Sequence, residues 1–357
     1  MSSNDRPDRL ILHLGHGKTG STSIQRTLRA SRQALHAAGL LFPDPGRHDN
    51  HQLLFPHLHG DLPDDPVQMA SLAATPEAAR TNAKGLWTAL LQQIAKERPR
   101  GVILSCENQF RPLPPDALHR LTQHCAQIAQ RTQVVAYLRS PAQFFLSNIQ
   151  QDVKKRAEFR PISASRIRDT LGPFVDHGPG PVSARCFARD QLLGGDVVTD
   201  FAQRFLPELD ADSLTRGAAE ENSSVSAEAM ALLQQVFRGH RDLPRAYAKD
   251  LKGFRKIIVE TDKAVEGYRR PALFSEVRQI AEARVSDLEW TRDVLGVTFA
   301  DVPAPGMTRA AAETAYATLR DVAQVCAVDS HRLEALWQQT LARAKTQARP
   351  FGWLFRR

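Results

Sequence analysis

The sequence predicts an α/β protein in which a parallel β-sheet is flanked by helices and is followed by a mainly helical C-terminal region. Two observations carry this prediction. Up to about residue 215, short continuous apolar runs, typical of strands buried on both faces of a parallel sheet, alternate with amphipathic helical segments. From residue 216 onward the apolar residues recur mainly at helical spacing. We therefore expect two domains, at 1–215 and 216–357.

The first predicted strand is the apolar run Leu10–Leu14, and a glycine-rich loop follows it. Beyond this loop, residues at helical spacing predict a helix that ends where Gly39 supplies a left-handed C-cap. The chain thus begins with the order strand, loop, helix. The helical positions are Ile24, Leu28, Ser31, Leu35 and Ala38.

The same order recurs along the rest of the first domain. Strands are predicted over 101–105, 133–138 and 182–187. Helices are predicted from Pro114 to about Ile128, from Ser140 to about Arg156, and over 196–206. The second of these helices begins with a serine N-cap followed by proline at its first position. These elements build a parallel sheet by repeated crossover connections.

The C-terminal region is predicted from helical periodicity alone. The polar segment 241–270 stays unassigned, and 61–80, rich in proline, aspartate and alanine, is interpreted as an excursion from the fold. The basic, aromatic tail 349–357 is expected to dock on the protein rather than to bind a membrane or a partner. The predicted helices are Ser226–Arg238, Pro271–Leu295, Thr308–Cys326 and Ser330–Ala344.

Composition and charge exclude several classes of protein. With 42% hydrophobic and 24% charged residues the chain is neither disordered nor of low complexity. No apolar run approaches the ~20 residues of a membrane span, and the polar start Met1–Arg9 lacks a secretory pattern; we expect a cytoplasmic protein. The net charge of +8 favours anionic partners. The scattered cysteines Cys106, Cys125, Cys186 and Cys326 predict reduced thiols rather than disulfides or a zinc site.

The strongest chemical signal is the loop between the first strand and the first helix. Backbone N–H groups of a glycine-rich turn, together with a helix N-terminus, form a cradle for phosphate, to which Lys18 adds a full charge. A Walker A loop needs glycine at position 12, which is leucine here, so an ordinary ATP or GTP loop is disfavoured. His16 is expected to line the site. The predicted binding residues are Gly17, Lys18, Thr19, Gly20, Ser21 and Thr22.

A second anion site is predicted at Arg139, which follows the strand 133–138. Ligands of open α/β sheets bind at the carboxyl ends of the strands, and an arginine grips phosphate bidentately. Ser147, about two helical turns further on, is placed to donate a hydrogen bond to the same phosphate. An Arg-Ser-Pro sequence alone fits a helix cap better than a binding site, and its combination with the Lys18 loop is what indicates binding.

These two motifs resemble those of a known family. The loop Gly17–Ser23 is similar to the 5′-phosphosulfate loop of sulfotransferases, and Tyr137–Pro141 with Ser147 is similar to their 3′-phosphate motif. The likeness covers roughly residues 9–235, where the segments 185–196 and 221–226 resemble bacterial carbohydrate sulfotransferases.

The resemblance implies a P-loop-like fold and an enzyme that uses 3′-phosphoadenosine 5′-phosphosulfate (PAPS) as co-substrate. It implies transfer of a sulfuryl group to a hydroxyl or amine, with a glycan as the expected acceptor and with Lys18 stabilising the leaving oxygen. Because the moving group carries a single negative charge, no metal is demanded. No nucleic-acid partner is expected.

An acceptor hydroxyl also needs a base. Glu107 follows the strand 101–105 and is the first choice, although it could instead pair with Arg111 or another cation. His51 is the rival, because an imidazole titrates near neutrality.

Two other clusters were considered. The histidines at 48, 51, 57 and 59 match no zinc spacing, so they are interpreted as surface or acceptor-site residues. The basic run 154–156 with Arg160 either guides an anionic acceptor or is a solvated helix end.

Two other functions remain open from sequence. One is a nucleotide kinase or NTPase with an altered phosphate loop. The other is a non-catalytic binder of polyanions or nucleic acid, which the net charge of +8 suggests. The chain lacks clustered basic and aromatic repeats, which argues against the second.

Overall fold

The computed structural model describes residues 6–347, apart from 59–61, 63–65, 108–109, 218–223, 301 and 303–305. The basic tail 349–357, His59 and the segment 221–223 therefore lie outside the described residues. The chain forms two compact units, each described by itself below. Unit 1 comprises Met1–Ser140, Ala164–Glu220 and Ser286–Asp301, and unit 2 comprises Pro141–Ser163, Glu221–Val285 and Val302–Arg357.

Both units are discontinuous in sequence, which differs from the single boundary predicted at residue 215. The segment 141–163 belongs to unit 2, and the segment 286–301 belongs to unit 1. The first of these carries α6 (Pro141–Asp152), whose Phe145 and Ile149 are buried in the core of unit 2. Periodicity shows which face of a helix is buried but not which partner covers it, so the sequence could not assign α6.

Unit 1 is built on a five-stranded parallel sheet with the order β2-β3-β1-β4-β5, which confirms the predicted α/β class. β1 lies in the centre, where Leu14 pairs with Cys106 of β3 and His13 pairs with Val135 of β4. The carboxyl ends of these strands therefore meet at one edge. The strands are β1 (Arg9–Leu14), β2 (Leu40–Leu41), β3 (Gly101–Cys106), β4 (Arg131–Leu138) and β5 (Val182–Cys186).

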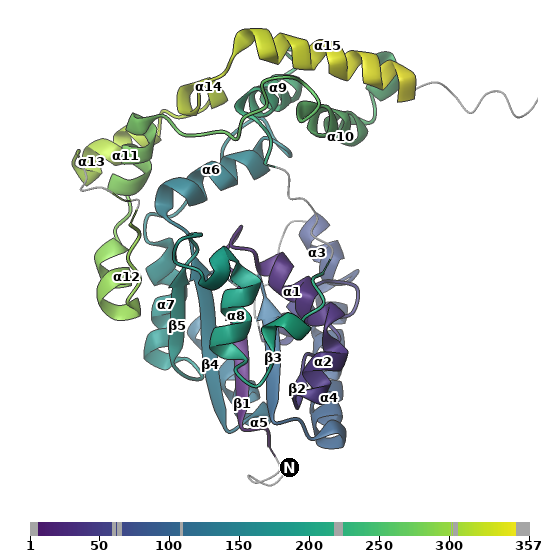
Figure 1. Ribbon diagram of the computed structural model, residues 1–357, viewed down its shortest axis with the longest axis vertical. Coiled ribbons are helices and arrows are strands. Elements are labelled where there is room, and N and C mark those ends of the chain that lie inside the picture. The colour runs from purple at the N-terminus through teal and green to yellow at the C-terminus, as the bar shows by residue number, and fades with distance from the viewer. Residues whose placement is uncertain are drawn as a thin grey trace, which may run out of the picture. The chain divides into compact units, whose positions relative to one another are not determined.

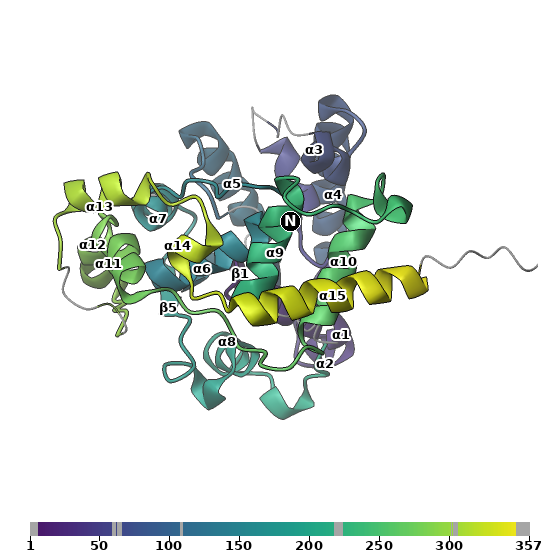
Figure 2. The same ribbon diagram turned by 90° about the horizontal axis from the view of Figure 1, so that it is seen from above.

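Helices cover both faces of this sheet (Figures 1 and 2). One face carries α1 (Ser21–Ala30), α2 (Arg32–Ala37) and α8 (Val197–Phe205), and the other carries α4 (Pro76–Glu97), α5 (Pro115–Ile128) and α7 (Arg166–His177). The helix predicted up to residue 38 breaks into α1 and α2 at Ser31. Unit 1 also contains α3 (Pro66–Leu72), α12 (Leu288–Leu295) and the short 3-10 helices η2 (Gln52–His57), η3 (Leu193–Gly195) and η4 (Ala211–Ser213).

A buried carboxylate fixes α8 on the sheet. Asp200 is fully buried and accepts hydrogen bonds from Tyr137 Oη at 2.7 Å, Arg204 Nε at 2.8 Å and the Leu193 backbone N–H at 3.0 Å. Burial, together with the Asp200 carboxylate, raises the pKa of Tyr137, which remains a neutral donor. Both oxygens of the buried carboxylate are thus hydrogen-bonded, as its burial requires.

Unit 2 is helical, as predicted for the C-terminal region. The polar segment 241–270, for which the sequence predicts no element, contains α10, and the helix predicted over 271–295 is divided between α11 of unit 2 and α12 of unit 1. The long α15 packs on α9 and α10 (Figure 2). Among the described residues, no helix combines the length and the apolarity needed to cross a bilayer. Besides α6, unit 2 contains α9 (Ala227–Phe237), α10 (Leu251–Asp262), α11 (Ser275–Ala283), α13 (Arg309–Tyr316), α14 (Val322–Val325), α15 (Ser330–Gln347) and the 3-10 helix η5 (Arg245–Tyr247).

A buried arginine joins three helices of unit 2. Arg332 of α15 is 7% exposed and donates to Glu228 Oε2 at 2.9 Å, Asp262 Oδ1 at 2.9 Å and Ser226 Oγ at 2.7 Å. Asp262, at the end of α10, also accepts hydrogen bonds from the backbone N–H and the hydroxyl of Ser226, which caps α9. One cation therefore bridges both carboxylates in a largely buried position.

Candidate functional site

The loop between β1 and α1 has the geometry of an anion cradle. A Cβ atom at Gly15 would lie 2.4 Å from Ser21 Oγ, so only glycine fits where the loop turns. Gly20 is the N-cap of α1 with φ 76°, and it offers no side-chain cap. The first turn of α1 contains no acidic residue. Its N–H groups and the positive end of the helix dipole are therefore available to an anion.

Lys18 occupies the strained position of this loop. Its φ of 66° lies in the left-handed region, which costs a non-glycine residue about 1–2 kcal/mol. Strain of this kind persists only where the surroundings hold the residue, and it is common at binding sites. The Lys18 backbone N–H donates to the Glu107 carboxylate, and the Lys18 ammonium is close enough to act on the same group.

Glu107 is the first residue after β3, beside the loop. A Cβ atom at Gly15 would lie only 3.1 Å from the Glu107 Cα atom. Burial raises the pKa of Glu107 above its ordinary 4.5, and the charge and N–H group of Lys18 partly oppose this rise. The carboxylate is therefore a stronger base than a solvated one, as a general base needs to be.

Arg139 lies on the same edge of the sheet as the loop. Its backbone N–H donates to His16 Nδ1 at 3.4 Å, so the residue after β4 is joined to the loop after β1. The Arg139 guanidinium carbon lies 5.1 Å from the ring centre of Phe187, which directly follows β5. The same ring borders the loop, since a Cβ atom at Gly20 would lie 3.3 Å from Phe187 Cε2. The two predicted anion grips are therefore neighbours.

Arg166, at the start of α7, is a third cation in this group that the sequence analysis missed. Its Nη2 donates to the Phe110 carbonyl at 3.0 Å, and the His16 ring packs against the Phe110 ring at a tilt, with centroids 4.5 Å apart. Burial, followed by the charges of Arg166 and Arg139, holds the pKa of His16 well below its ordinary value. His16 is therefore neutral at neutral pH. Pro173 lies in the interior of α7, where proline is unusual, so the sequence did not predict this helix. The position of Arg166 at its start was therefore not predicted either.

Two buried donors of the site, Ser21 Oγ and Arg139 Nε, have no hydrogen-bond partner among the described residues. Buried donors that stay unpaired are costly, so they mark places where a ligand or water is expected to bind. The Thr19 hydroxyl donates to the His16 carbonyl at 2.5 Å and so stabilises the loop itself, while its contact with an anion stays a prediction.

His51 lies in the interior of unit 1, 3% exposed. Its Nδ1 accepts from the Ser105 backbone N–H at 3.0 Å, and its Nε2 donates to the Pro43 carbonyl at 3.1 Å. Burial lowers the pKa of His51 to about 4. Since both ring nitrogens are engaged with the backbone, the ring holds η2 against β3, and the geometry favours Glu107 as the base.

Ser147 and the basic run belong to unit 2. Ser147 is buried on α6, whereas Arg139 belongs to unit 1, so their joint contact with a phosphate stays a prediction. In the basic run, Arg160 donates from its backbone N–H and Nε to the buried Asp152 at 2.9 and 2.7 Å, and Arg156 Nε lies 3.6 Å from the same carboxylate. These two arginines therefore neutralise a buried charge at the end of α6.

The described histidines of the stretch 48–57 are dispersed. His48 Nε2 lies 2.8 Å from the Ser71 carbonyl, and the His57 ring centroid lies 5.5 Å from that of His124. Within the described part of the chain, no three His, Cys, Asp or Glu side chains are grouped as metal ligands would be.

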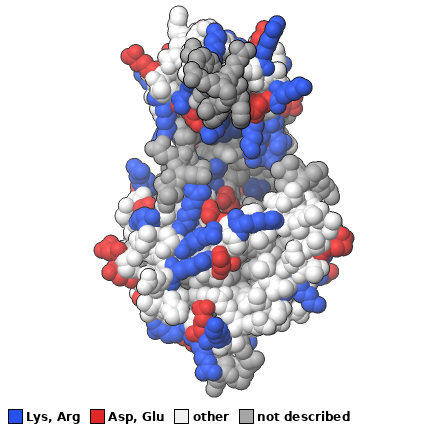
Figure 3. Space-filling model, turned by 90° about the vertical axis from the view of Figure 1, so that its right-hand side faces the viewer, with Lys and Arg blue, Asp and Glu red and all other residues white. Residues whose placement is uncertain are grey.

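Charges on the surface of unit 1 are mixed. On the face shown in Figure 3, basic side chains of unit 1 lie next to acidic ones rather than in one continuous field. Two ion pairs of this unit, Arg26–Asp49 and Arg32–Asp44, each join a helix to the loop after β2 at 2.8 Å. These two arginines are therefore paired with carboxylates rather than free to attract a polyanion.

Comparison with known proteins leaves the site to be interpreted from its own geometry. The chain matches no protein-family model, no curated protein and no solved structure. The interpretation therefore depends on the grouping of Lys18, Glu107, Arg139 and Arg166 at one edge of the sheet.

Proposed function

We propose that this protein is a sulfotransferase that moves the sulfuryl group of PAPS to an acceptor hydroxyl or amine, with a glycan as the preferred acceptor class. The observation that carries the proposal is the adjacency of the Lys18 loop and Arg139, which are joined by the His16 hydrogen bond and by their shared neighbour Phe187. PAPS carries one anionic group on each side of its ribose, and so requires two anion sites close together.

The donors of the site suit such a ligand. The N-terminus of α1, Ser21 Oγ and Lys18 would hold the 5′-phosphosulfate, and the Arg139 guanidinium would hold the 3′-phosphate. The donor would supply the sulfuryl group, and adenosine 3′,5′-bisphosphate would be the second product.

The catalytic roles follow from charge and proximity. Glu107 takes the proton of the acceptor hydroxyl as the acceptor oxygen bonds to sulfur. Lys18 stabilises the negative charge that develops on the bridging oxygen as its bond to sulfur breaks. Neutral His16 holds Arg139 through its backbone N–H and adds no charge to the site.

A nucleotide kinase or NTPase is the second candidate, and one observation favours it. Glu107 ends the strand next to the phosphate loop, where an acidic residue in NTPases holds Mg²⁺. Titration calorimetry with adenosine 3′,5′-bisphosphate, with Mg²⁺–ATP and with heparin separates these enzymes and the polyanion binder. Tight binding of the bisphosphate without metal is the expected result, and indifference to it would end the sulfotransferase proposal.

Arg139→Ala tests the assignment of the 3′-phosphate. Losing a charge-assisted hydrogen bond of about 1.5–3 kcal/mol weakens binding of adenosine 3′,5′-bisphosphate by about tenfold or more. Adenosine 5′-monophosphate, which lacks the 3′-phosphate, is expected to bind almost unchanged. Arg131→Ala, at the exposed opposite end of the same strand, is the control. An equal loss for both nucleotides would contradict the assignment.

Glu107→Gln tests the base. The base acts only when deprotonated, so the wild-type rate should fall as pH is lowered through the pKa of Glu107, which lies above 4.5 because the group is buried. In the Glu107→Gln variant this fall of the rate at acid pH, the acidic limb of the pH–rate profile, should disappear. The maximal rate should be about 10²–10⁴-fold lower. His51→Gln should leave the midpoint of the limb in place. If the limb moves with His51 and survives Glu107→Gln, the two assignments are reversed.

A further inference from the structure

A buried polar network in unit 1 adjoins the loop that contains Lys18. Its centre is the hydroxyl of Ser105, which is fully buried on β3, two residues before Glu107. His13 Nδ1 lies 2.8 Å from Ser105 Oγ, and Gln25 Nε2 donates to the same oxygen at 2.9 Å. His13 and Gln25 are also buried. One hydroxyl therefore joins β1, β3 and α1.

The two partners of this hydroxyl lie at opposite ends of the loop. His13 lies two residues before Gly15, where the loop begins. Gln25 lies one helical turn after Ser21, the first residue of α1. The beginning of the loop is also joined to β3 by its backbone, since the Gly15 N–H donates to the Cys106 carbonyl at 3.1 Å. Both ends of the loop are therefore held to the strand that precedes the candidate base.

The surroundings of this network on the sheet are apolar. His13 and Ser105 are register partners on β1 and β3, and the preceding partners on the same face, Ile11 and Ile103, belong to the apolar core. Polar groups in such a place are costly unless they are hydrogen-bonded. Another apolar pair would also hold the two strands together, so the polar pair indicates a role beyond packing.

Ser105 is itself fixed through its backbone. Its N–H donates to His51 Nδ1 at 3.0 Å, and its carbonyl accepts from the His51 N–H at 2.9 Å. Burial lowers the pKa of His13 to about 4, so this ring is neutral at neutral pH and adds no charge next to the loop. The network therefore provides a fixed and neutral support.

The loop needs a support because the backbone of Lys18 is strained. Its φ of 66° lies in the left-handed region, where a residue stays only if its surroundings hold it. If one end of the loop were released, Lys18 could return to an ordinary backbone conformation, and the cradle would be lost. An anion would then bind only the fraction of molecules with a formed cradle, and its apparent affinity would fall by that fraction.

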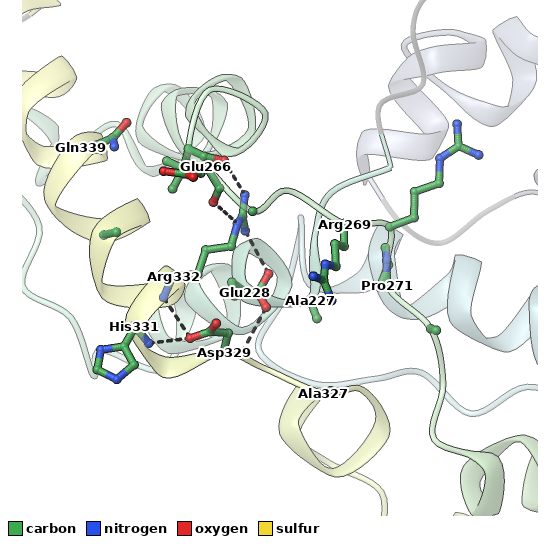
Figure 4. Close-up of a pocket in the computed structure, with 15 residues that line it drawn as sticks. Ala227, Glu228, Glu266, Arg269, Pro271, Ala327, Asp329, His331, Arg332 and Gln339 are labelled. Atoms are coloured by element: carbon green, nitrogen blue, oxygen red, sulfur yellow. Dashed lines mark hydrogen bonds and ion pairs between the residues drawn. The ribbon is translucent and has the colours of Figure 1, made fainter.

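The buried network of unit 2 is of another kind. Arg332 bridges Glu228 and Asp262, and Figure 4 shows Arg332 and Glu228 in the lining of a pocket. This lining holds as many arginines as carboxylates, so the pocket favours neither an anion nor a cation. The network around Arg332 joins helices of unit 2, whereas the network around Ser105 joins the two ends of an anion loop.

We propose that Ser105 is a positioning residue for the anion cradle. Its hydroxyl holds His13 and Gln25, and these two residues fix the ends of the loop. Lys18 and the N-terminus of α1 are thereby held in place relative to Glu107. The inference rests on the proposed function in that it takes the loop to be an anion site, but it does not depend on which group is transferred.

The test is titration calorimetry with inorganic pyrophosphate, which reports anion binding by the loop whatever the reaction. Ser105→Ala and Gln25→Met each remove one side of the same hydrogen bond. Each is expected to weaken pyrophosphate binding by about tenfold, as the loss of one buried hydrogen bond implies. Because both groups act through one contact, the double variant should bind about as weakly as the weaker single variant.

Two controls show what the probe reports. Lys18→Ala removes the charge of the loop and should weaken pyrophosphate binding at least as much as Ser105→Ala. Thr170→Val removes a buried hydroxyl of unit 1 that has no hydrogen-bond partner among the described residues, so it should bind pyrophosphate as the wild type does. Thermal unfolding followed by circular dichroism measures the stability of each variant separately from its affinity.

The outcomes separate this inference from the proposed function. It is overturned if the wild type binds no pyrophosphate, if Lys18→Ala leaves binding unchanged, or if Ser105→Ala loses stability but keeps wild-type affinity. It is also overturned if the effects of Ser105→Ala and Gln25→Met add in the double variant. Weaker pyrophosphate binding by Ser105→Ala, in a protein that does not bind adenosine 3′,5′-bisphosphate, would support this inference while ending the sulfotransferase proposal.

Discussion

Lys18→Ala is expected to reduce sulfuryl transfer from PAPS by about 10²–10³-fold, the usual effect of removing a preorganised charge from a developing oxyanion. The reason is local. Lys18 is held in a strained backbone position beside the carboxylate of Glu107 and the N-terminus of α1. Among the described residues, no other lysine lies in this loop that could take its place. The measurement is a single-turnover assay with labelled PAPS, which separates the chemical step from binding.

Lys96→Ala, an exposed lysine on α4, is the matched control and should keep the wild-type rate. Lys18→Arg keeps the charge but changes its geometry, so it should recover only part of the loss. A Lys18→Ala variant with a near-normal single-turnover rate would refute the role of this residue. A variant that binds PAPS poorly but transfers normally when saturated would limit Lys18 to binding.

Arg332→Met is expected to lower the free energy of unfolding of unit 2 by about 3–5 kcal/mol, because it leaves two carboxylates without their shared cation in a buried position. Glu228 and Asp262 both depend on this guanidinium, and Asp262 is fully buried. Methionine keeps much of the side-chain volume and helix propensity of arginine. The decrease in the free energy of unfolding therefore reports the loss of the positive charge. Chemical denaturation followed by circular dichroism measures it.

The control lies on the same helix. Arg343 Nη2 pairs with Glu260 at 3.1 Å, but this pair is exposed, so Arg343→Met should cost about 1 kcal/mol or less. Because the two units can unfold separately, the transition of unit 2 has to be followed by its own signal. Trp337 is buried in the core of unit 2, and its fluorescence provides this signal in a background where the other three tryptophans are replaced by phenylalanine. Equal effects of the two substitutions would show that the buried network adds nothing.

The central part of the fold was predictable because its strands are continuous apolar runs. Such runs are typical of strands in a parallel sheet that is covered by helices on both faces. The edge strand β2, two residues long, carries no such signal. The helix α4 was missed even though Thr75, Pro76 and Glu77 begin it with a proper cap. The buried face of α4 includes alanines. Because alanine is also common at exposed positions of helices, the sequence does not show that this face is buried.

The site was predictable where it follows directly from strand ends. Lys18, Glu107 and Arg139 come after β1, β3 and β4, and neighbouring parallel strands bring such residues to one edge. The contacts of Arg166 and His51 depend on packing between segments that are distant in the sequence. Nothing in the local sequence indicates that Arg166 reaches the carbonyl of Phe110, or that the His51 ring satisfies the backbone of Ser105.

The interleaving of the two units has a consequence for how the protein can be made. During synthesis, unit 1 cannot be completed until residues 286–301 have left the ribosome, by which time most of unit 2 has emerged. A fragment cut at residue 215 would keep α6 without the core that covers Phe145 and Ile149, and would lack α12. Neither half of this polypeptide is a separable piece, because each unit takes segments from both halves of the chain.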